Sequence, residues 1–151
     1  MLVYEEPRKE GASEADAELC EGWQAMSVAE SPLHVLCIDD DQDILSLLEL
    51  SLKHSIGADV TVSLSGAAAI ELFGVGLRPD VILLDADLGA EDGQDVAARL
   101  IAGEDSRGTP VIMVSGGGPI AAPGAIGYIK KPFDPMTIGD EILRQLAEVN
   151  V

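Results

Sequence analysis

Apolar residues from position 34 onward fall into short runs separated by longer periodic segments. Three unbroken runs of four apolar residues occupy positions 35–38, 81–84 and 111–114. Unbroken runs flanked by polar or turn residues are typical of strands that are covered on both faces. Residues 60–64 alternate between apolar and polar, and residues 127–130 form a short run, so we expect both segments to be edge strands.

The segments between these strands carry helical periods. Ile44, Leu48 and Leu52 form one apolar stripe, with Glu49 and Lys53 four residues apart on the polar side. Further helices are expected at 65–73 and around Val96, Leu100 and Ile101. The last helix is expected to follow Asp134 as its N-cap, with Pro135 as its first residue. Its apolar face consists of Ile138, Ile142, Leu146 and Val149. This alternation predicts an α/β fold, a doubly wound parallel sheet with helices on both faces.

An acidic segment precedes this pattern. Residues 1–32 hold eight acids and two bases, and so contribute −6 to the formal charge of −18 on the chain of 151 residues. We therefore divide the chain into an acidic N-terminal arm, 1–32, and a domain, 33–151. Apolar residues at helical spacing, among them Leu19 and Trp23, predict a short helix at 13–26. The alternatives are a disordered tail and a helix that docks on this domain or on a partner.

Composition excludes several classes of partner. The seven lysines and arginines within 32–151 are too few and too scattered to bind the phosphates of a nucleic acid. No apolar run approaches the roughly 20 residues that span a bilayer, and the N-terminus lacks the order of a signal peptide. We therefore expect a cytoplasmic protein without a membrane partner. Cys20 and Cys37 lack metal-site spacing and are not expected to form a disulfide.

Polar residues follow the ends of four predicted strands. Asp39 and Asp40 follow the first, Asp85 and then Asp87 the third, Ser115 ends the fourth, and Lys131 follows the fifth. Because the carboxyl ends of parallel strands form the ligand-binding edge of such a sheet, we expect these side chains to converge. Clustered carboxylates repel one another unless a divalent cation relieves them, and oxygen ligands favour Mg²⁺. The pattern predicts a magnesium site.

Magnesium held by carboxylates leaves room for a phosphoryl group beside it. A carboxylate can attack that group and form an acyl phosphate, while a lysine neutralises charge on the phosphoryl oxygens. Lys131 can supply this charge, and Ser115 can donate a hydrogen bond to a phosphoryl oxygen. His34 and His54 are expected to be surface or flanking residues rather than nucleophiles.

At successive strand ends, Asp39-Asp40, Asp85, Ser115 and Lys131-Pro132-Phe133 resemble the motifs of the response-regulator receiver domain, over residues 33–149. The resemblance implies a flavodoxin-like sheet of order 2-1-3-4-5, with Asp85 as the phospho-acceptor. It implies that Mg²⁺ is bound directly by Asp40 and Asp85, through water by Asp39 and by the backbone carbonyl of Asp87. It also implies that Lys131 contacts the phosphate and precedes a cis peptide bond, and that Tyr128 is a switch residue coupled to the Ser115 hydroxyl.

The chain departs from the family pattern at two places. Asp87 stands where the family usually has an amide, apolar or basic residue, and this further carboxylate predicts slow or strongly Mg²⁺-dependent phosphorylation. Only 12 residues, with three consecutive glycines and two prolines, separate Ser115 from Tyr128, so we expect the family's fourth helix to be shortened or missing. Leu19 and Trp23 of the arm are candidates to cover apolar surface exposed there.

These observations predict a single-domain response regulator. It accepts a phosphoryl group on Asp85 from a phosphohistidine of a histidine kinase or a histidine phosphotransfer protein, and signals by binding a downstream protein or by phosphorelay. We expect slow self-dephosphorylation at most and no effector domain after Val151. A receiver-like interaction module that acts without phosphate is the first alternative, and a Mg²⁺-dependent aspartyl phosphatase the second. Homodimerisation is left open.

Overall fold

The computed structural model describes residues 32–118 and 122–149, so the arm's predicted helix at 13–26 lies outside the described residues. Five parallel strands form one sheet in the order β2-β1-β3-β4-β5, which is the order implied by the resemblance. The strands are β1 (His34–Ile38), β2 (Asp59–Ser63), β3 (Val81–Asp85), β4 (Val111–Ser115) and β5 (Gly127–Lys130). As predicted, β2 and β5 are the edge strands. The boundary between arm and domain stays a prediction.

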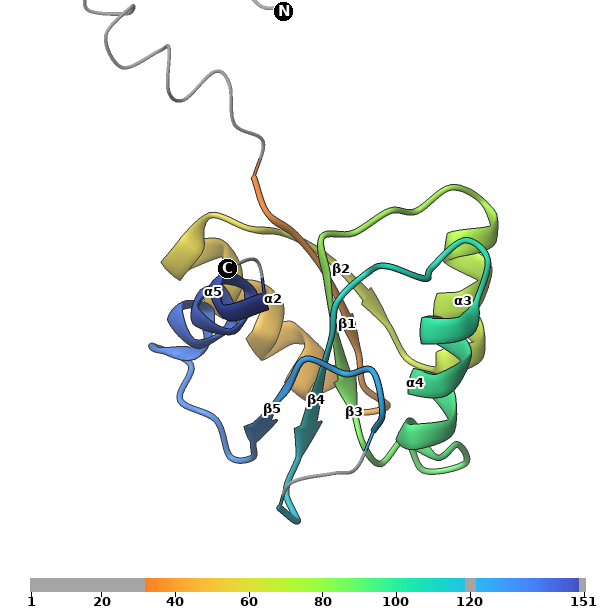
Figure 1. Ribbon diagram of the computed structural model, residues 1–151. Helices are drawn as coiled ribbons and strands as arrows, with labels where there is room; N and C mark the ends of the chain where they lie inside the picture. The colour runs from red at the N-terminus through yellow and green to blue at the C-terminus, as the bar shows by residue number, and fades with distance from the viewer. Residues whose placement is uncertain (1–31, 119–121, 150–151) are drawn as a thin grey trace, which may run out of the picture. The chain divides into compact units, whose positions relative to one another are not determined.

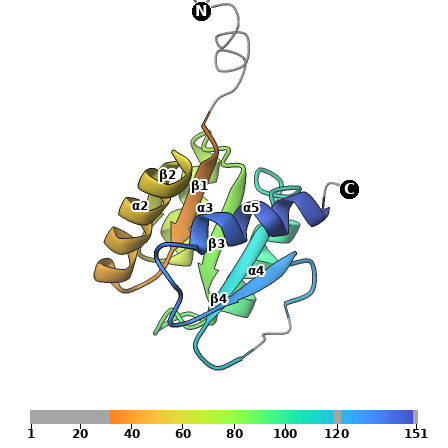
Figure 2. The same ribbon diagram turned by 90° about the vertical axis from the view of Figure 1, so that its left-hand side faces the viewer.

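Four helices of the described residues cover the two faces of the sheet. They are α2 (Gln42–Ile56), α3 (Gly66–Gly74), α4 (Gly93–Ala102) and α5 (Ile138–Val149). Helices α2 and α5 lie on one face, and α3 and α4 on the other (Figures 1 and 2). None of the described helices combines the length and the apolar character that crossing a membrane requires.

The two faces of the sheet carry separate apolar clusters. Strands β3 and β4 are buried at every residue, which explains why their apolar runs are unbroken rather than alternating. On the face of α2 and α5, Leu48, Leu52 and Ile142 pack over Cys37, whose thiol is free. On the opposite face, Leu100 of α4 and other apolar residues of α3 and α4 pack against the strand side chains that point to that face. Burial raises the pKa of the Cys37 thiol to about 12, so this cysteine is an apolar core residue without thiolate chemistry.

Polar groups set where the helices begin. The side chains of Asp41, Ser65 and Asp92 cap α2, α3 and α4 by accepting backbone N–H groups of the first turn. The predicted start of the last helix at Pro135 is too early, because residues 135–137 form a turn and α5 begins at Ile138. The Asp134 carbonyl accepts hydrogen bonds from residues 137 and 138 and so opens this turn.

The connection from β4 to β5 contains no helix in its described residues, 116–118 and 122–126. It forms bends after Ser115 and a turn in which the Ala125 amide donates to the Ala122 carbonyl at 2.9 Å. Ala122 and Ala125 pack against the cluster on the α3 and α4 face. The prediction of a shortened or missing fourth helix is therefore confirmed. The large exposed apolar side chains of the described residues lie elsewhere, on α2, β2, α5 and adjoining turns.

Candidate functional site

Three carboxylates meet at the carboxyl ends of β1 and β3. Asp39 and Asp40 follow β1, and Asp85 is the last residue of β3. The two strands pair in register, Ile38 opposite Leu84, so their ends lie side by side. Oxygen atoms of the three carboxylates all lie within 4.8 Å of one another, with Asp39 and Asp85 buried and Asp40 exposed. The predicted convergence of these side chains is present in the structure.

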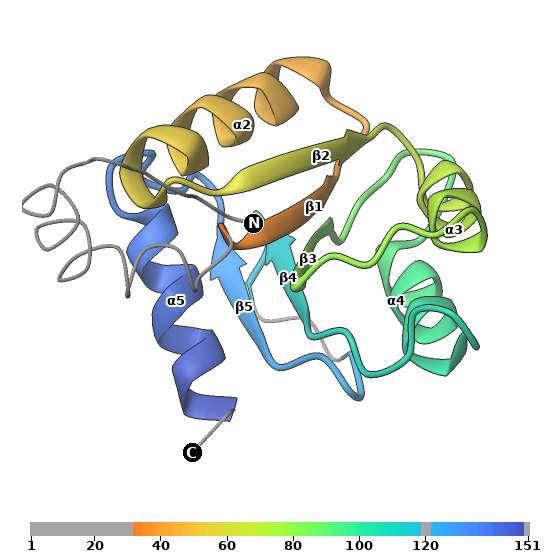
Figure 3. The same cartoon turned by 90° about the horizontal axis from the view of Figure 1, so that it is seen from above.

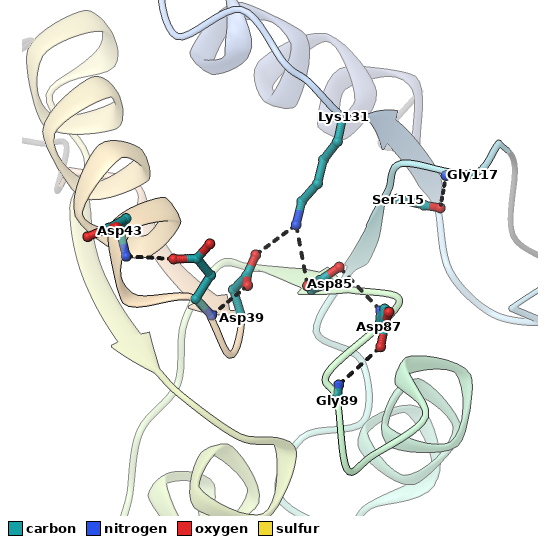
Figure 4. Close-up of polar contacts among 9 residues, drawn as sticks. Asp39, Asp43, Asp85, Asp87, Gly89, Ser115, Gly117 and Lys131 are labelled. Atoms are coloured by element: carbon teal, nitrogen blue, oxygen red, sulfur yellow. Dashed lines mark hydrogen bonds and ion pairs between the residues drawn. The ribbon is translucent and has the colours of Figure 1, made fainter.

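Lys131 lies between the two buried carboxylates (Figure 4). Its Nζ atom is 3.0 Å from Asp39 Oδ2 and 3.3 Å from Asp85 Oδ2. The Lys131 amide donates to the Ser115 carbonyl at 2.8 Å, which extends the contact between β4 and β5 by one residue. The Lys131–Pro132 peptide bond is cis, as the resemblance implied.

The second oxygen of each buried carboxylate is held by a backbone amide. The Asp41 N–H donates to Asp39 Oδ1 at 2.9 Å, and the Asp87 N–H donates to Asp85 Oδ1 at 3.2 Å. Both bonds join a side chain to the amide two residues later, a local geometry that aspartate favours. Each carboxylate is therefore held by an amide on one oxygen and by the lysine on the other.

Burial and charge oppose each other at this site. Burial raises the pKa of Asp85 above its ordinary value, the hydrogen bond from the Asp87 amide acts in the opposite direction, and the charge of Asp39 raises the pKa further. Burial acts to lower the pKa of Lys131, but the hydrogen bond to Asp39 and the charges of Asp39 and Asp85 outweigh it and raise this pKa. The lysine is therefore held in its charged form, and it offsets the repulsion between two carboxylates.

These groups line a cavity of about 360 Å³ at the edge of the sheet. Its walls are formed by Asp39, Asp40, Asp41, Asp85, Asp87, Gly89, Gly116 and Lys131. Five carboxylates thus face a single ammonium group, and a divalent cation would lower the resulting repulsion. Gly89 has a φ of +73°, in the left-handed region that favours glycine, and a Cβ atom there would lie 2.9 Å from Asp40 Oδ2, so a larger residue would also displace this carboxylate.

Asp87 lines the cavity but is not part of the cluster of three carboxylates. Its Oδ1 atom accepts a hydrogen bond from the Gly89 amide at 3.0 Å, so one of its oxygens belongs to the loop after β3 (Figure 4). The residue therefore adds negative charge beside Asp85 while helping to shape the loop. Its predicted role through the backbone carbonyl stays a prediction.

Ser115 and Tyr128 are not among the residues that line the cavity. The Ser115 hydroxyl accepts a hydrogen bond from the Gly117 amide at 3.1 Å (Figure 4). Tyr128 pairs with Met113, and its carbonyl accepts from Gln145 Nε2 at 3.2 Å. The Tyr128 hydroxyl makes no hydrogen bond to any other residue that the structure describes. Coupling between Ser115 and Tyr128 therefore stays a prediction.

Two residues outside the sequence-based set also shape the site. Glu91, in the loop after β3, accepts the Gly66 amide at 2.7 Å on Oε1 and the Ala67 amide at 3.1 Å on Oε2. It thereby ties the loop that contains Asp87 to the N-terminus of α3. Gly93 opens α4 against the site, where a Cβ atom would lie 2.4 Å from the Asp85 carbonyl oxygen. For Gly93, the sequence shows only that a glycine follows an aspartate of the kind that caps helices. For Glu91, no local sequence pattern indicates its contacts.

The comparison with family models decides the identity of the domain. The response regulator receiver domain matches residues 35–143. The chain belongs to this family. A receiver domain is a phospho-acceptor module of two-component signalling, and receiver domains bind Mg²⁺ at an acidic site. The all-oxygen donor set of Asp39, Asp40 and Asp85 fits such a hard cation.

Individual relatives agree with the receiver assignment. Protein Rrf1 of Nitratidesulfovibrio vulgaris is 30% identical over 118 residues, which cover 77% of this chain and 84% of that protein. The DNA-binding dual master transcriptional regulator RpaA of Synechocystis is 36% identical over 106 residues, or 66% of this chain and 43% of RpaA. A crystal structure described as that of a response regulator from Chloroflexus aurantiacus matches with a TM-score of 0.68 and 29% identity, covering 78% of this chain and 99% of that one. The chain spans most of Rrf1 and less than half of RpaA.

Proposed function

We propose that this receiver domain accepts a phosphoryl group on Asp85 from a phosphohistidine donor, with Mg²⁺, and signals through protein contacts or by phosphorelay. The observation that carries the proposal is the placement of Asp85. Its carboxylate lies at the end of β3, within 4.8 Å of the Asp39 and Asp40 oxygens, and 3.3 Å from the Lys131 ammonium. An anionic nucleophile beside a cation site and a fixed positive charge suits phosphoryl transfer.

Asp40 and Asp85 are the residues we assign to direct metal binding. Asp39 is more deeply buried and already bonded to Lys131, which suits a role through water, and Asp87 would offer its backbone carbonyl. Bound Mg²⁺ supplies positive charge for the phosphoryl oxygens and lowers the repulsion that they would meet from these acids. Because the Asp40 side chain is exposed, its carboxylate loses little hydration energy through burial, and this supports direct binding to a cation.

The chain's own groups carry the transfer. An Asp85 carboxylate oxygen forms a bond to phosphorus, while the phosphorus–nitrogen bond of the donor breaks and its electron pair returns to the imidazole. Lys131 moves from the carboxylate to a phosphoryl oxygen, with Asp39 still holding the ammonium. Ser115 does not line the cavity, so its hydroxyl, which can donate while its oxygen accepts from the Gly117 amide, must move to reach the same group, and we propose that Tyr128 follows this change.

A hollow beside Lys131 supports a docking position for the donor protein. Ile44 and Leu47 of α2 and Pro132 and Phe133 after β5 line it with Lys131, and it has a volume of about 370 Å³. Its apolar walls adjoin the acidic cavity, because Lys131 belongs to both. A histidine kinase or a phosphotransfer protein seated here would present its phosphohistidine to Asp85.

Intact mass after incubation with acetyl phosphate and Mg²⁺ tests the proposal. We expect an adduct of about 80 Da, the mass of one phosphoryl group, that is absent from Asp85→Asn. Asp43→Asn is the matched control, because Asp43 is an exposed acid of α2 outside the cavity, and it should keep the adduct. Absence of the adduct in the unmodified chain would contradict the proposal.

The other outcomes of this experiment separate the two alternatives. An interaction module that acts without phosphate gives no adduct, and the feature that favours it is the position of Ser115 outside the lining of the cavity. An aspartyl phosphatase gives repeated turnover of acetyl phosphate rather than a lasting adduct. Cytoplasmic location, the downstream partner and homodimerisation remain predictions, and light scattering with and without the phosphoryl group tests the last of them.

A further inference from the structure

A third concave surface lies at the opposite edge of the sheet from β5, where β2 is the edge strand (Figure 3). It is a groove of about 650 Å³ that shares no residue with the acidic cavity. Its lining comes from three elements and the adjoining turns: Gln42, Leu45, Ser46, Glu49, Val62, Ser63, Leu64, Ala68, Glu71, Leu72 and Val75. We call this surface the β2 groove.

Apolar side chains in the β2 groove face solvent to an unusual extent. The exposed fractions are 41% for Val62, 52% for Leu64 and 83% for Val75. Three of the eight large apolar side chains that are exposed in the described residues thus meet in one groove. Single exposed apolar residues need no explanation, but a cluster of them in a concave surface is typical of a protein-binding site.

The free edge of β2 adds backbone groups to this surface. The Asp59 amide donates to the Leu33 carbonyl, and the Ser63 carbonyl accepts from Asp39, so these residues turn their polar backbone groups towards the β1 side. Alternate residues of a parallel strand turn to opposite edges, so Val62 presents its N–H and C=O on the other side. No strand among residues 32–118 and 122–149 pairs with β2 there. An added strand could bond to Val62.

The negative charge of the β2 groove favours some binding partners over others. Glu49 and Glu71 are its charged lining residues, and no lysine or arginine of the part of the chain that the structure describes lines it. Lys53 pairs with Glu49 at 3.3 Å, whereas Glu71 forms no ion pair with a described residue. The chain as a whole carries −18 and its first 32 residues carry −6, so a second copy or the acidic arm would bring like charge to these carboxylates.

We infer that the β2 groove binds an extended segment of a partner protein in which pairs of apolar residues alternate with pairs of lysine or arginine, so that each face of the segment carries both kinds of side chain. The segment adds a strand to the free edge of β2 through the Val62 backbone. Its apolar side chains cover Leu64 and Val75, and its bases face Glu49 and Glu71. This site is independent of the acidic cavity and of phosphoryl transfer.

The probe for this site is a labelled peptide of about seven residues, the length of a typical strand, in which pairs of valines alternate with pairs of lysines. We expect it to bind the full chain in a fluorescence anisotropy titration, and its counterpart with glutamate in place of lysine to fail. Val62→Pro removes the outward N–H and leaves the bonds to β1, since proline is tolerated on the free side of an edge strand. Val62→Ala keeps the N–H and is the matched control.

Strand addition at β2 predicts a specific order of peptide affinities among the variants. Val62→Pro should weaken peptide binding at least about tenfold relative to Val62→Ala, with both variants folded by circular dichroism. Glu71→Lys should weaken it about fivefold or more, whereas Asp140→Lys, an equal charge change on the exposed side of α5, should change it less than about twofold. Hydrogen exchange of the Val62 amide should slow when the peptide is bound.

Four results would overturn the inference. Equal binding by Val62→Pro and Val62→Ala excludes strand addition at this edge. Equal loss in Glu71→Lys and Asp140→Lys means that the peptide responds only to net charge. A dimer of the unmodified chain in light scattering that Val62→Pro disrupts assigns the groove to a second copy, and peptide binding that appears only after residues 1–31 are deleted assigns it to the arm.

Discussion

Two loops flank Asp85, and they are held in different ways. The loop after β3, residues 86–92, is fixed at both ends, by the Asp87 amide on Asp85 Oδ1 and by the Gly93 amide on the Ala86 carbonyl at 3.0 Å. The loop after β4 begins with three glycines, its Gly117 amide donates to the Ser115 oxygen, and Ser115 does not line the cavity. The acidic half of the site is therefore in place before any ligand binds, whereas the hydroxyl half must rearrange to meet a phosphoryl group.

The two loops should therefore control different steps: the loop after β3 controls metal binding and phosphoryl transfer, and the loop after β4 controls the change that follows transfer. Groups on the β1 and β3 side should govern metal affinity and the reactivity of Asp85, because their oxygens are already oriented. The Ser115 hydroxyl at the end of β4 should govern what happens after transfer, because it does not line the cavity and must first move to reach a phosphoryl oxygen. Substitutions on each side test this division, and metal binding should give the largest effect.

Magnesium should stabilise the fold through the acidic half alone. At about 100 times its dissociation constant, a ligand that binds only the folded chain raises the free energy of unfolding by about 2.7 kcal/mol. We expect urea unfolding to show a gain of this size with Mg²⁺, most of it lost in Asp40→Asn and kept in the control Asp43→Asn. An equal gain in all three proteins would show that Mg²⁺ acts on surface charge in general.

The pH dependence of this gain follows from the raised pKa of Asp85. Without metal, the folded chain binds a proton at Asp85 more tightly than the unfolded chain, so this group's contribution to stability falls as the pH rises through its raised pKa. Mg²⁺ competes with that proton. The stabilisation by Mg²⁺ should therefore shrink as the pH falls towards the same pKa, and chemical unfolding at a series of pH values measures both trends.

Glu91 should give the next largest effect, because it ties the acidic loop to α3. Glu91→Ala leaves the Gly66 and Ala67 amides without their carboxylate acceptor, which we expect to lower the free energy of unfolding by about 1–2 kcal/mol. Urea unfolding measures this, with Glu104→Ala as the control for loss of an exposed acid. Equal stability of the two variants would show that the loop is held without Glu91.

Sequence reasoning found the acidic half of the site and missed Glu91, and the reason is physical. Unbroken apolar runs mark buried parallel strands, so the residues after them must meet at one edge, as Asp39 and Asp85 do. Glu91 acts on a helix end 25 residues earlier in the chain, and no local period records such a contact. The direction of the Ser115 hydroxyl likewise depends on the backbone after β4 rather than on residue type.

The charge of Asp87 should have a smaller effect on the reactivity of Asp85. Asp87→Asn keeps an oxygen that can accept the Gly89 amide and removes one negative charge from the cavity wall. Exposed charges a few ångströms apart interact by about 0.5–1 kcal/mol, so phosphorylation by acetyl phosphate should become roughly two- to fivefold faster and less dependent on Mg²⁺. Unchanged rates of phosphorylation and dephosphorylation would remove Asp87 from the explanation.

Ser115→Ala should have the smallest effect on adduct formation, and it tests whether the loop after β4 takes part in the transfer step. The hydroxyl is bonded to Gly117 and is absent from the cavity wall, so its loss removes no contact that orients Asp85 or a cation. We expect the initial rate of adduct formation, measured by intact mass, to stay within about threefold of the unmodified chain, which is about 0.6 kcal/mol and lies at the low end of what one neutral hydrogen bond contributes. A loss of about tenfold or more would mean that the hydroxyl turns to the phosphoryl group during transfer, and that both loops take part in the chemical step.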